Sequence, residues 1–204
     1  MEQEVLLNKE QLSVWTELVG KGIANAMQGL SQMTGEDINV SSLAIRQLPA
    51  NEVPDLFGGA GTAVVGIYLV VSGDADGHIV LVYQPETAFA LIDLLLGNPL
   101  GSTRGLDEME ESALGEMGNI TGTFFLNSLS DNLGLSLRPS PPMVVVDMIG
   151  AILDVPLASI MQRFDEVSVV EAMFGTHDRQ VAGRFMVVPT VELLDLLLKR
   201  NEVR

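Results

Sequence analysis

An internal repeat constrains the fold of this chain more than any other feature of its sequence. Shifting the 204-residue sequence by 99 positions aligns matching residues of two predicted helices: Ser13 with Ser112, Glu17 with Glu116, Leu30 with Leu129, Ser31 with Ser130 and Gly35 with Gly134. Farther along, Pro85 and Pro189 each end a strand and open a helix, and both of these helices contain Asp-Leu-Leu-Leu. The order of the predicted elements repeats as well as the individual residues, so an internal duplication explains the pattern better than chance matching.

Hydrophobic periodicity and turn residues predict the same order of elements in each half: a long helix, a strand, a hairpin and a shorter helix. In the first half we expect a helix over 9–33, a strand over 38–48, a turn or short helix over 51–57, a hairpin of 62–71 with 79–83, and a helix over 85–96. In the second half we expect a helix over 107–133, a strand from 135 that prolines interrupt, a strand or helix over 143–153, a hairpin of 166–174 with 181–188, and a final helix from 189 to about 200.

Two such units would share one antiparallel sheet. We therefore predict an α+β fold with pseudo-two-fold symmetry, in which two long helices and shorter helices pack on the sheet. The prediction is a single domain over residues 1–204, made of two repeats of about 9–97 and 107–202.

The charge balance excludes several classes of partner. The chain has 27 Asp and Glu against 11 Lys and Arg, a formal net charge of −16. Phosphate backbones and anionic lipids would repel such a surface, so nucleic acid and membranes are not expected as partners. Solubility and steering toward a partner are both open as reasons for the acidic surface.

Several kinds of chemical site are also missing from the sequence. There is no Cys and there are two isolated histidines, His78 and His177, so no metal site is expected. The run 58–61 is rich in Gly but lacks the Lys-Ser/Thr ending of a phosphate-binding loop. No apolar run has the length of a membrane helix, and the N-terminus has no basic leader, so we expect a cytoplasmic protein.

The second long helix carries a polar stripe. Ser112, Glu116 and Asn119 are spaced i, i+4 and i+7, and seven steps of 100° make about 700°, so the three side chains share one face. Apolar residues of the helix point in other directions and can face the sheet: Leu114, Met117, Phe124, Phe125 and Leu129. A solvated face with an incidental Glu and Asn is the alternative. Gly and Asn in mid-helix lower helix propensity, however, which favours a functional stripe.

At these residues the sequence resembles the CheC family of chemotaxis phosphatases, which also includes CheX and the phosphatase part of FliY. The family pattern is Asp or Ser, three residues, Glu, two residues, Asn, twenty-two residues and Pro. Ser112, Glu116, Asn119 and Pro142 fit it without a gap. The residues around this motif are also similar to CheC, and the resemblance covers nearly the whole chain, including both halves of the repeat.

The first half carries a broken copy of the same motif. Ser13 and Glu17 fit the pattern, but Gly20 stands where Asn is expected and Leu43 where Pro is expected. Glycine has no side chain with which to hold a water, so only the second half is expected to be catalytic. Weak docking of a partner at the first copy is left open.

The resemblance also implies an activity, which is removal of the phosphoryl group from phosphorylated CheY, a response regulator that is phosphorylated on Asp. Asn119 would orient the attacking water, and Glu116 would hold the partner through its active-site Lys. Ser112 and Pro142 would shape the site. The partner supplies the Mg²⁺, so no cofactor of the chain's own is expected.

CheD, a receptor deamidase, is a second partner that the resemblance implies. The family binds it through the segment after the motif Pro, which here is 146–153, with Asp147 and Met148 as the candidate contacts. An ordinary buried strand is the alternative for this segment. For the whole chain, the alternative to a phosphatase is a non-catalytic CheC-fold adaptor that docks CheY or CheD at the flagellar switch or the receptor.

Overall fold

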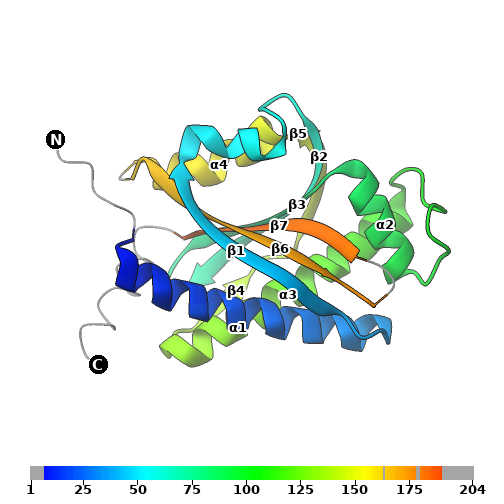
Figure 1. Cartoon of the computed structure of the whole chain (residues 1–204), viewed down its shortest axis with the longest axis horizontal. Coiled ribbons are helices and arrows are strands. Elements are labelled where there is room, and N and C mark those ends of the chain that lie inside the picture. Colours follow the sequence, from blue (N-terminus) through cyan, green and yellow to red (C-terminus); the bar gives the residue numbers. More distant parts are fainter. Residues whose placement is uncertain (1–6, 163, 178–179, 190–204) are drawn as a thin grey trace.

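A seven-stranded antiparallel sheet organises the chain in the computed structural model, which describes residues 7–162, 164–177 and 180–189 (Figure 1). The main path through the sheet runs β1-β6-β7-β3-β2-β4, and β5 also pairs with β2. The strands are β1 (Asn39–Pro49), β2 (Ala63–Gly73), β3 (Gly77–Tyr83), β4 (Leu137–Pro139), β5 (Met143–Met148), β6 (Glu166–Gly175) and β7 (Gln180–Pro189).

Strand pairing crosses from one half of the chain to the other. The hairpin β2–β3 lies in the first half and the hairpin β6–β7 in the second, and the two hairpins join through β3 and β7. The outer strand β1 of the first half pairs with β6, and the outer strand β5 of the second half pairs with β2. Each half therefore completes the sheet of the other, and both depend on one shared core.

Helices cover both faces of the sheet. The two long helices, α1 (Lys9–Thr34) and α3 (Glu108–Leu133), lie against each other on one face. Helix α4 (Ile149–Ile160) and the 3₁₀ helix η1 (Ala50–Phe57) lie on the opposite face, and α2 (Pro85–Leu95) packs beside α3 (Figure 1). Successive residues of β2 point to opposite faces of the sheet: Ile67 faces α3, and the neighbouring Gly66 faces Ile152 of α4.

Both long helices have the same kinds of capping motif at their two ends. Each has a capping box, formed by Asn8 with Gln11 in α1 and by Asp107 with Glu110 in α3. Each ends at a glycine with positive φ, at positions 35 and 134. Where the helices cross, a Cβ on Gly22 would lie 2.5 Å from the Phe125 ring, so the absence of a side chain lets α1 lie close to α3.

The predicted α+β fold with an antiparallel sheet is confirmed, and the predicted elements within the described residues begin and end within two residues of the observed ones, except the segment 143–153, whose observed helix continues to Ile160. The ambiguous segment 143–153 is a strand up to Met148 and a helix from Ile149 onward. The prolines interrupt the preceding strand one residue later than expected, because Pro139 still belongs to β4. The division into repeats of 9–97 and 107–202 stays a prediction, and the expected final helix falls on 190–204, outside the described residues. None of the described helices is both long and apolar enough to cross a membrane.

Candidate functional site

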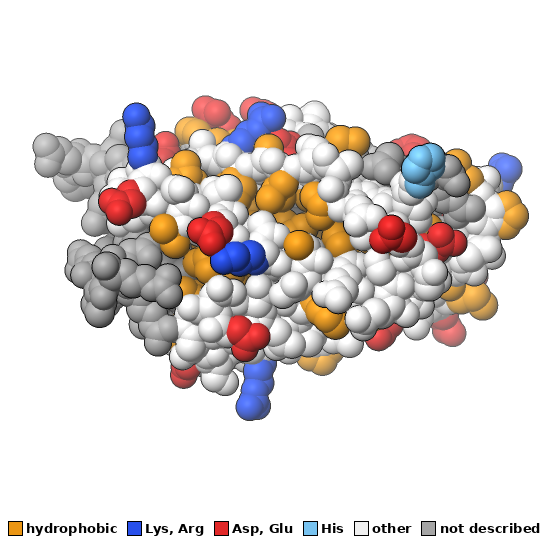
Figure 2. All heavy atoms as spheres, turned by 60° about the horizontal axis from the view of Figure 1, so that its bottom comes forward, with side chains coloured by type: hydrophobic (Ala, Val, Ile, Leu, Met, Phe, Trp, Pro, Cys, Tyr) orange, Lys and Arg blue, Asp and Glu red, His pale blue; other side chains and the backbone are white. Residues whose placement is uncertain are grey.

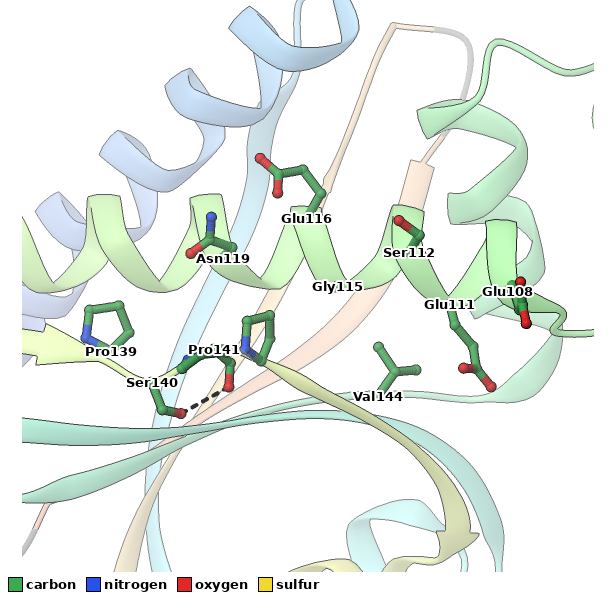
Figure 3. Close-up of a pocket in the computed structure, with 11 residues that line it drawn as sticks. Glu108, Glu111, Ser112, Gly115, Glu116, Asn119, Pro139, Ser140, Pro141 and Val144 are labelled. Atoms are coloured by element: carbon green, nitrogen blue, oxygen red, sulfur yellow. Dashed lines mark hydrogen bonds between the residues drawn. The ribbon is translucent and has the colours of Figure 1, made fainter.

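The polar stripe of α3 lines an open pocket with a volume of about 760 Å³ (Figure 3). Ser112, Glu116 and Asn119 are all exposed and all border it. On the other side of the helix, Leu114 and Met117 are completely buried in the core. The structure therefore places the three polar side chains on one face, as the helical spacing predicts.

The second wall of the pocket is the proline-rich segment 139–142, which joins β4 to β5 and runs alongside α3 (Figure 3). Ser140 ties this segment to β2, because its backbone N–H donates to the Val70 carbonyl at 2.7 Å and its Oγ accepts from the Val70 N–H at 3.0 Å. The same hydroxyl donates to the Pro141 carbonyl at 3.0 Å. Hydrogen bonds to the sheet and restricted proline φ angles thus hold this wall in one shape.

Gly118 sets the distance between the two walls. A Cβ on this residue would lie 2.5 Å from Cγ2 of Ile67 in β2 and 3.3 Å from Cβ of Pro142. The helix can approach the sheet and the proline segment this closely only because residue 118 has no side chain. The mid-helix glycine beside Asn119 therefore has a packing role that positions both Asn119 and Pro142.

The side chains of Glu116 and Asn119 are not engaged by other residues that the structure describes. Within the described part of the chain, neither makes a side-chain hydrogen bond or an ion pair. An amide that projects into a pocket without a partner keeps its acceptor oxygen and its two N–H donors for an incoming group. The arrangement offers one carboxylate and one amide, separated by about one helical turn.

Three carboxylates give the pocket a negative potential. Glu108 and Glu111, near the N-terminus of α3, border it together with Glu116, and its eleven lining residues include no Lys, Arg or His. Figure 2, which views the molecule from the side of α1 and α3, shows acidic side chains scattered widely over this side. A free phosphate anion would be repelled here, whereas a cationic group on a partner would be attracted.

No histidine takes part in the site. His78 lies on β3, where its Nδ1 hydrogen-bonds to the Tyr68 hydroxyl at 2.7 Å and its ring stacks on the Tyr68 ring. Burial lowers the pKa of His78, against an opposing effect of the Asp76 charge. His177 follows β6 and is exposed. Among the residues that the structure describes, no cluster of His, Asp or Glu side chains has the arrangement needed to hold a metal ion.

Asp93 anchors the loop that leads into α3. Its buried carboxylate accepts hydrogen bonds from the N–H groups of Gly101 at 2.6 Å, Ser102 at 3.1 Å and Thr103 at 2.9 Å, and from the Thr103 hydroxyl at 2.8 Å. Burial alone would raise the pKa of Asp93, but these hydrogen bonds outweigh it and lower the pKa. The anchored loop ends at Asp107, the N-cap of α3, so Asp93 helps to fix where the polar stripe begins.

The broken first copy of the motif lies on α1 in a different state. Ser13 and Glu17 are exposed, but Glu17 accepts a hydrogen bond from Lys21 Nζ at 2.6 Å in an ion pair. A Cβ on Gly20 would lie 3.6 Å from the Leu43 side chain, which is ordinary van der Waals contact. This face therefore presents a paired carboxylate and a bare stretch of helix backbone.

The segment 146–153, predicted to bind CheD, divides in two: residues 146–148 end the edge strand β5, and residues 149–153 begin α4. Val146, Asp147 and Met148 are exposed, whereas Ile149 and Leu153 are buried, so the alternative of an ordinary buried strand is wrong for 146–148, and the buried part of the segment is helical. The carboxylate of Asp147 accepts a hydrogen bond from the Met148 N–H at 2.7 Å. The geometry leaves the strand accessible and does not identify what binds it.

Sequence reasoning missed part of the pocket. Glu108 precedes Ser112 by four residues and lies on the same helical face, so extending the i, i+4 spacing toward the N-terminus would have found it. Ser140 and Val144 gave no such signal, because their place in the pocket depends on how the proline segment pairs with β2.

Comparison with known proteins confirms the resemblance to the CheC family. The sequence model of the CheC-like family matches residues 109–146, which include the stripe and the proline segment. The CheY-P phosphatase CheC of Bacillus subtilis (strain 168) is 28% identical over 94% of this chain and 93% of its own length.

Two crystal structures show a similar fold. Thermotoga maritima FliY has a TM-score of 0.76 and 23% identity, covering 96% of this chain and 97% of the other. A chain of the CheX–CheY–BeF₃–Mg²⁺ complex from Borrelia burgdorferi has a TM-score of 0.53 and 16% identity, covering 84% and 98%.

Proposed function

We propose that this chain hydrolyses the aspartyl phosphate of a phosphorylated response regulator of the CheY type. The observation that carries the proposal is the Asn119 amide, which has no hydrogen-bond partner among the described residues and projects beside Glu116 into a pocket whose described lining includes no cationic side chain. This combination suits a protein that completes another protein's active site.

Asn119 supplies the catalytic group. An amide has both an acceptor and donors on a short stem, so it can hold a water molecule and direct one lone pair toward phosphorus. Hydrolysis of an acyl phosphate is intrinsically easier than that of a phosphate ester, so orienting the water is sufficient help. The eleven residues that line the pocket include no histidine, and the proposed role of Asn119 involves no proton transfer, so the rate should vary little with pH around neutrality.

Glu116 docks the partner. Its carboxylate lies about one helical turn from Asn119 and binds the active-site Lys of the response regulator in a charge-assisted hydrogen bond. Ser112 continues the stripe, and Pro142 packs against the helix beside Gly118, so both shape the surface that the partner meets.

The charge of the pocket favours a protein-bound phosphoryl group over a free one. The pocket is lined by three carboxylates, and its lining residues include no cationic side chain that could neutralise a phosphate dianion. The phosphoryl group must therefore arrive with cations from the partner, which are the Mg²⁺ ion and the Lys beside the phosphorylated Asp. The chain then needs no cofactor of its own.

Two of the relatives support this assignment. The Bacillus subtilis relative, similar over most of its length, is named a CheY-P phosphatase. One protein of similar fold, CheX from Borrelia burgdorferi, crystallised in a complex with CheY, BeF₃ and Mg²⁺. A partner of the same class fits the charge and geometry of the pocket described above.

Phosphate release tests the proposal directly. A CheY-type response regulator is phosphorylated with acetyl phosphate and Mg²⁺, freed of donor, and incubated with a tenth of its concentration of this chain. We expect phosphate release to accelerate well beyond the rate of the response regulator alone. p-Nitrophenyl phosphate serves as a control and should not be hydrolysed, because it brings no cation to the pocket. Release at the unassisted rate, with the chain bound to the response regulator, would support the adaptor alternative.

A docking function at β5 is the second candidate, and the exposed edge strand favours it. Val146, Asp147 and Met148 present an unpaired strand edge with apolar side chains and one charge. CheD is the partner that we propose for this edge. Replacing Met148 with Asp should weaken binding of CheD in a pull-down with purified proteins, while phosphate release from CheY stays unchanged. Equal binding of CheD by both forms would remove this assignment.

A further inference from the structure

A second groove lies directly beside the catalytic stripe. It has a volume of about 770 Å³ and shares Glu108, Ser112 and Glu116 with the first pocket. Its other lining residues come from three helices or their ends: Met33, Leu96, Asp107, Met109 and Ala113. The stripe of α3 is thus a ridge between two depressions, and a partner seated on Glu116 meets both.

The second groove differs from the first in its chemistry. Its floor is apolar, formed by Met33 near the end of α1, Leu96 at the end of α2 and Ala113 of α3. Met109 stands at its edge with 65% of its surface exposed, which is high for a large hydrophobic side chain. Carboxylates of residues 107, 108 and 116 lie around the apolar floor. The groove therefore fits an apolar side chain that has a basic neighbour.

The groove lies within reach of a partner whose phosphorylated site meets Asn119. Ten residues of helix rise about 15 Å, so Met109 is about 15 Å from Asn119 along the axis of α3. A standard protein interface buries about 800 Å² on each side, equivalent to a disc with a radius of about 16 Å. A response regulator centred between Glu116 and Asn119 therefore covers most or all of this groove.

We propose that the groove lined by Met33, Leu96 and Met109 binds an apolar side chain, flanked by a basic one, on the surface of the phosphorylated response regulator. This inference rests on the proposed function, and it assigns to Met109 a role in affinity and partner choice rather than in the chemical step. A second copy of the chain is a poor occupant, because two copies that each carry a net charge of −16 repel one another at this acidic rim.

Substitution of Met109 tests the proposal. Met109 is the second residue of α3 and is exposed, so polar substitutions there leave the core intact. Met109→Ser removes the apolar contact, Met109→Lys also opposes a basic neighbour, and Met109→Leu retains the contact. Met161→Ser is the matched control, since Met161 is 51% exposed and follows α4 on the opposite face of the sheet.

Two readouts are compared for each variant: KM and kcat for phosphate release from phosphorylated CheY, and Kd for CheY activated with beryllofluoride and Mg²⁺. We expect KM and Kd to rise about 5- to 10-fold for Met109→Ser and further for Met109→Lys, with kcat within twofold of the original chain. Met109→Leu and Met161→Ser should match the original chain.

The outcomes separate this inference from the proposed function. An original chain that binds activated CheY but releases no phosphate contradicts the proposed function, and a raised Kd for Met109→Ser would still support the groove. An active original chain whose KM and Kd are unchanged in Met109→Ser and Met109→Lys overturns the groove. A change of oligomeric state in Met109→Ser, seen by light scattering, would assign the surface to a second copy and also overturn it.

Discussion

Helices α1 and α3 have the same length of 26 residues, the same kind of capping box and the same glycine at the C-terminal end, yet their exposed faces differ. On α3, Glu116 is unpaired within the described residues, and Asn119 projects beside it. On α1, the equivalent Glu17 is bound to Lys21, and Gly20 stands at the place of the Asn.

The sequence differences behind this contrast are small. Four residues after the glutamate, α1 has Lys21 where α3 has an isoleucine, and an i, i+4 Glu–Lys pair forms readily on an exposed helix. Leu43 occupies the place of Pro142 and rests near Gly20. The two helices thus keep the same caps and differ at two helical positions and at one position on the segment packed beside each helix, and the proposed function depends on these three differences.

The largest effect should come from removing the amide on α3. Asn119→Ala removes the group that we propose orients the water, and such an interaction acts mainly in the transition state, so kcat should fall about 10²-fold while Kd for activated CheY stays within threefold. Asn127→Ala, at an exposed position two turns farther along the same helix, is the control and should retain full activity. If affinity fell in proportion to kcat, Asn119 would be a docking residue.

Removing the free carboxylate should have the next largest effect. Glu116→Ala removes the proposed charge-assisted contact to the partner's Lys, so Kd should rise about 10- to 100-fold. Raising the salt concentration should weaken the original complex in the same direction. The matched change on α1, Glu17→Ala, should alter Kd less than twofold, because that carboxylate is already paired. Equal losses from both changes would show that partners dock on both faces.

Gly118→Ala tests whether the close approach of α3 to the sheet depends on the absence of a side chain at this position. The new Cβ would lie 2.5 Å from Cγ2 of the fully buried Ile67, so α3 has to shift. The free energy of unfolding should fall by about 1–3 kcal/mol. Denaturant unfolding followed by circular dichroism measures it. Unchanged stability would mean that the helix is not held as tightly against β2 as described here.

A glycine-to-alanine change on α1, at the position that corresponds to Asn119, should have the opposite sign and the smallest size. A Cβ on Gly20 meets Leu43 at 3.6 Å, an ordinary contact, and alanine has the higher helix propensity. Gly20→Ala should therefore raise the free energy of unfolding by about 0.5–1 kcal/mol, measured in the same way. Destabilisation would indicate that Gly20, like Gly118, is needed for close packing.

The sequence predicted the stripe of α3 well because helical spacing is a local property. Ser112, Glu116 and Asn119 follow the 100° rotation per residue, and nothing elsewhere in the chain is needed to place them on one face. The capping residue Asp107 and the terminal Gly134 are local signals of the same kind, so the ends of the helix were also found.

The features that sequence alone did not show depend on contacts between distant segments. The tie between Ser140 and Val70 joins residues seventy positions apart. The segment 143–153 changes from strand to helix at Ile149, where backbone N–H groups of residues 149 and 150 bond to the carbonyls of Thr62 and Ala60. Periodicity cannot reveal such partners, and the apolar groove beside Met109 escaped notice for the same reason, because three helices build it.

One measurement tests most directly whether α3 alone is catalytic. It compares the rate of phosphate release from phosphorylated CheY that is saturated either with the Asn119→Ala variant or with the double variant Asn119→Ala, Glu17→Ala. We predict that both variants leave CheY at or near its unassisted rate, because the α1 face has no group that holds water. Substantial acceleration by the single variant that disappears in the double variant would contradict the account, since it would show that α1 is catalytic.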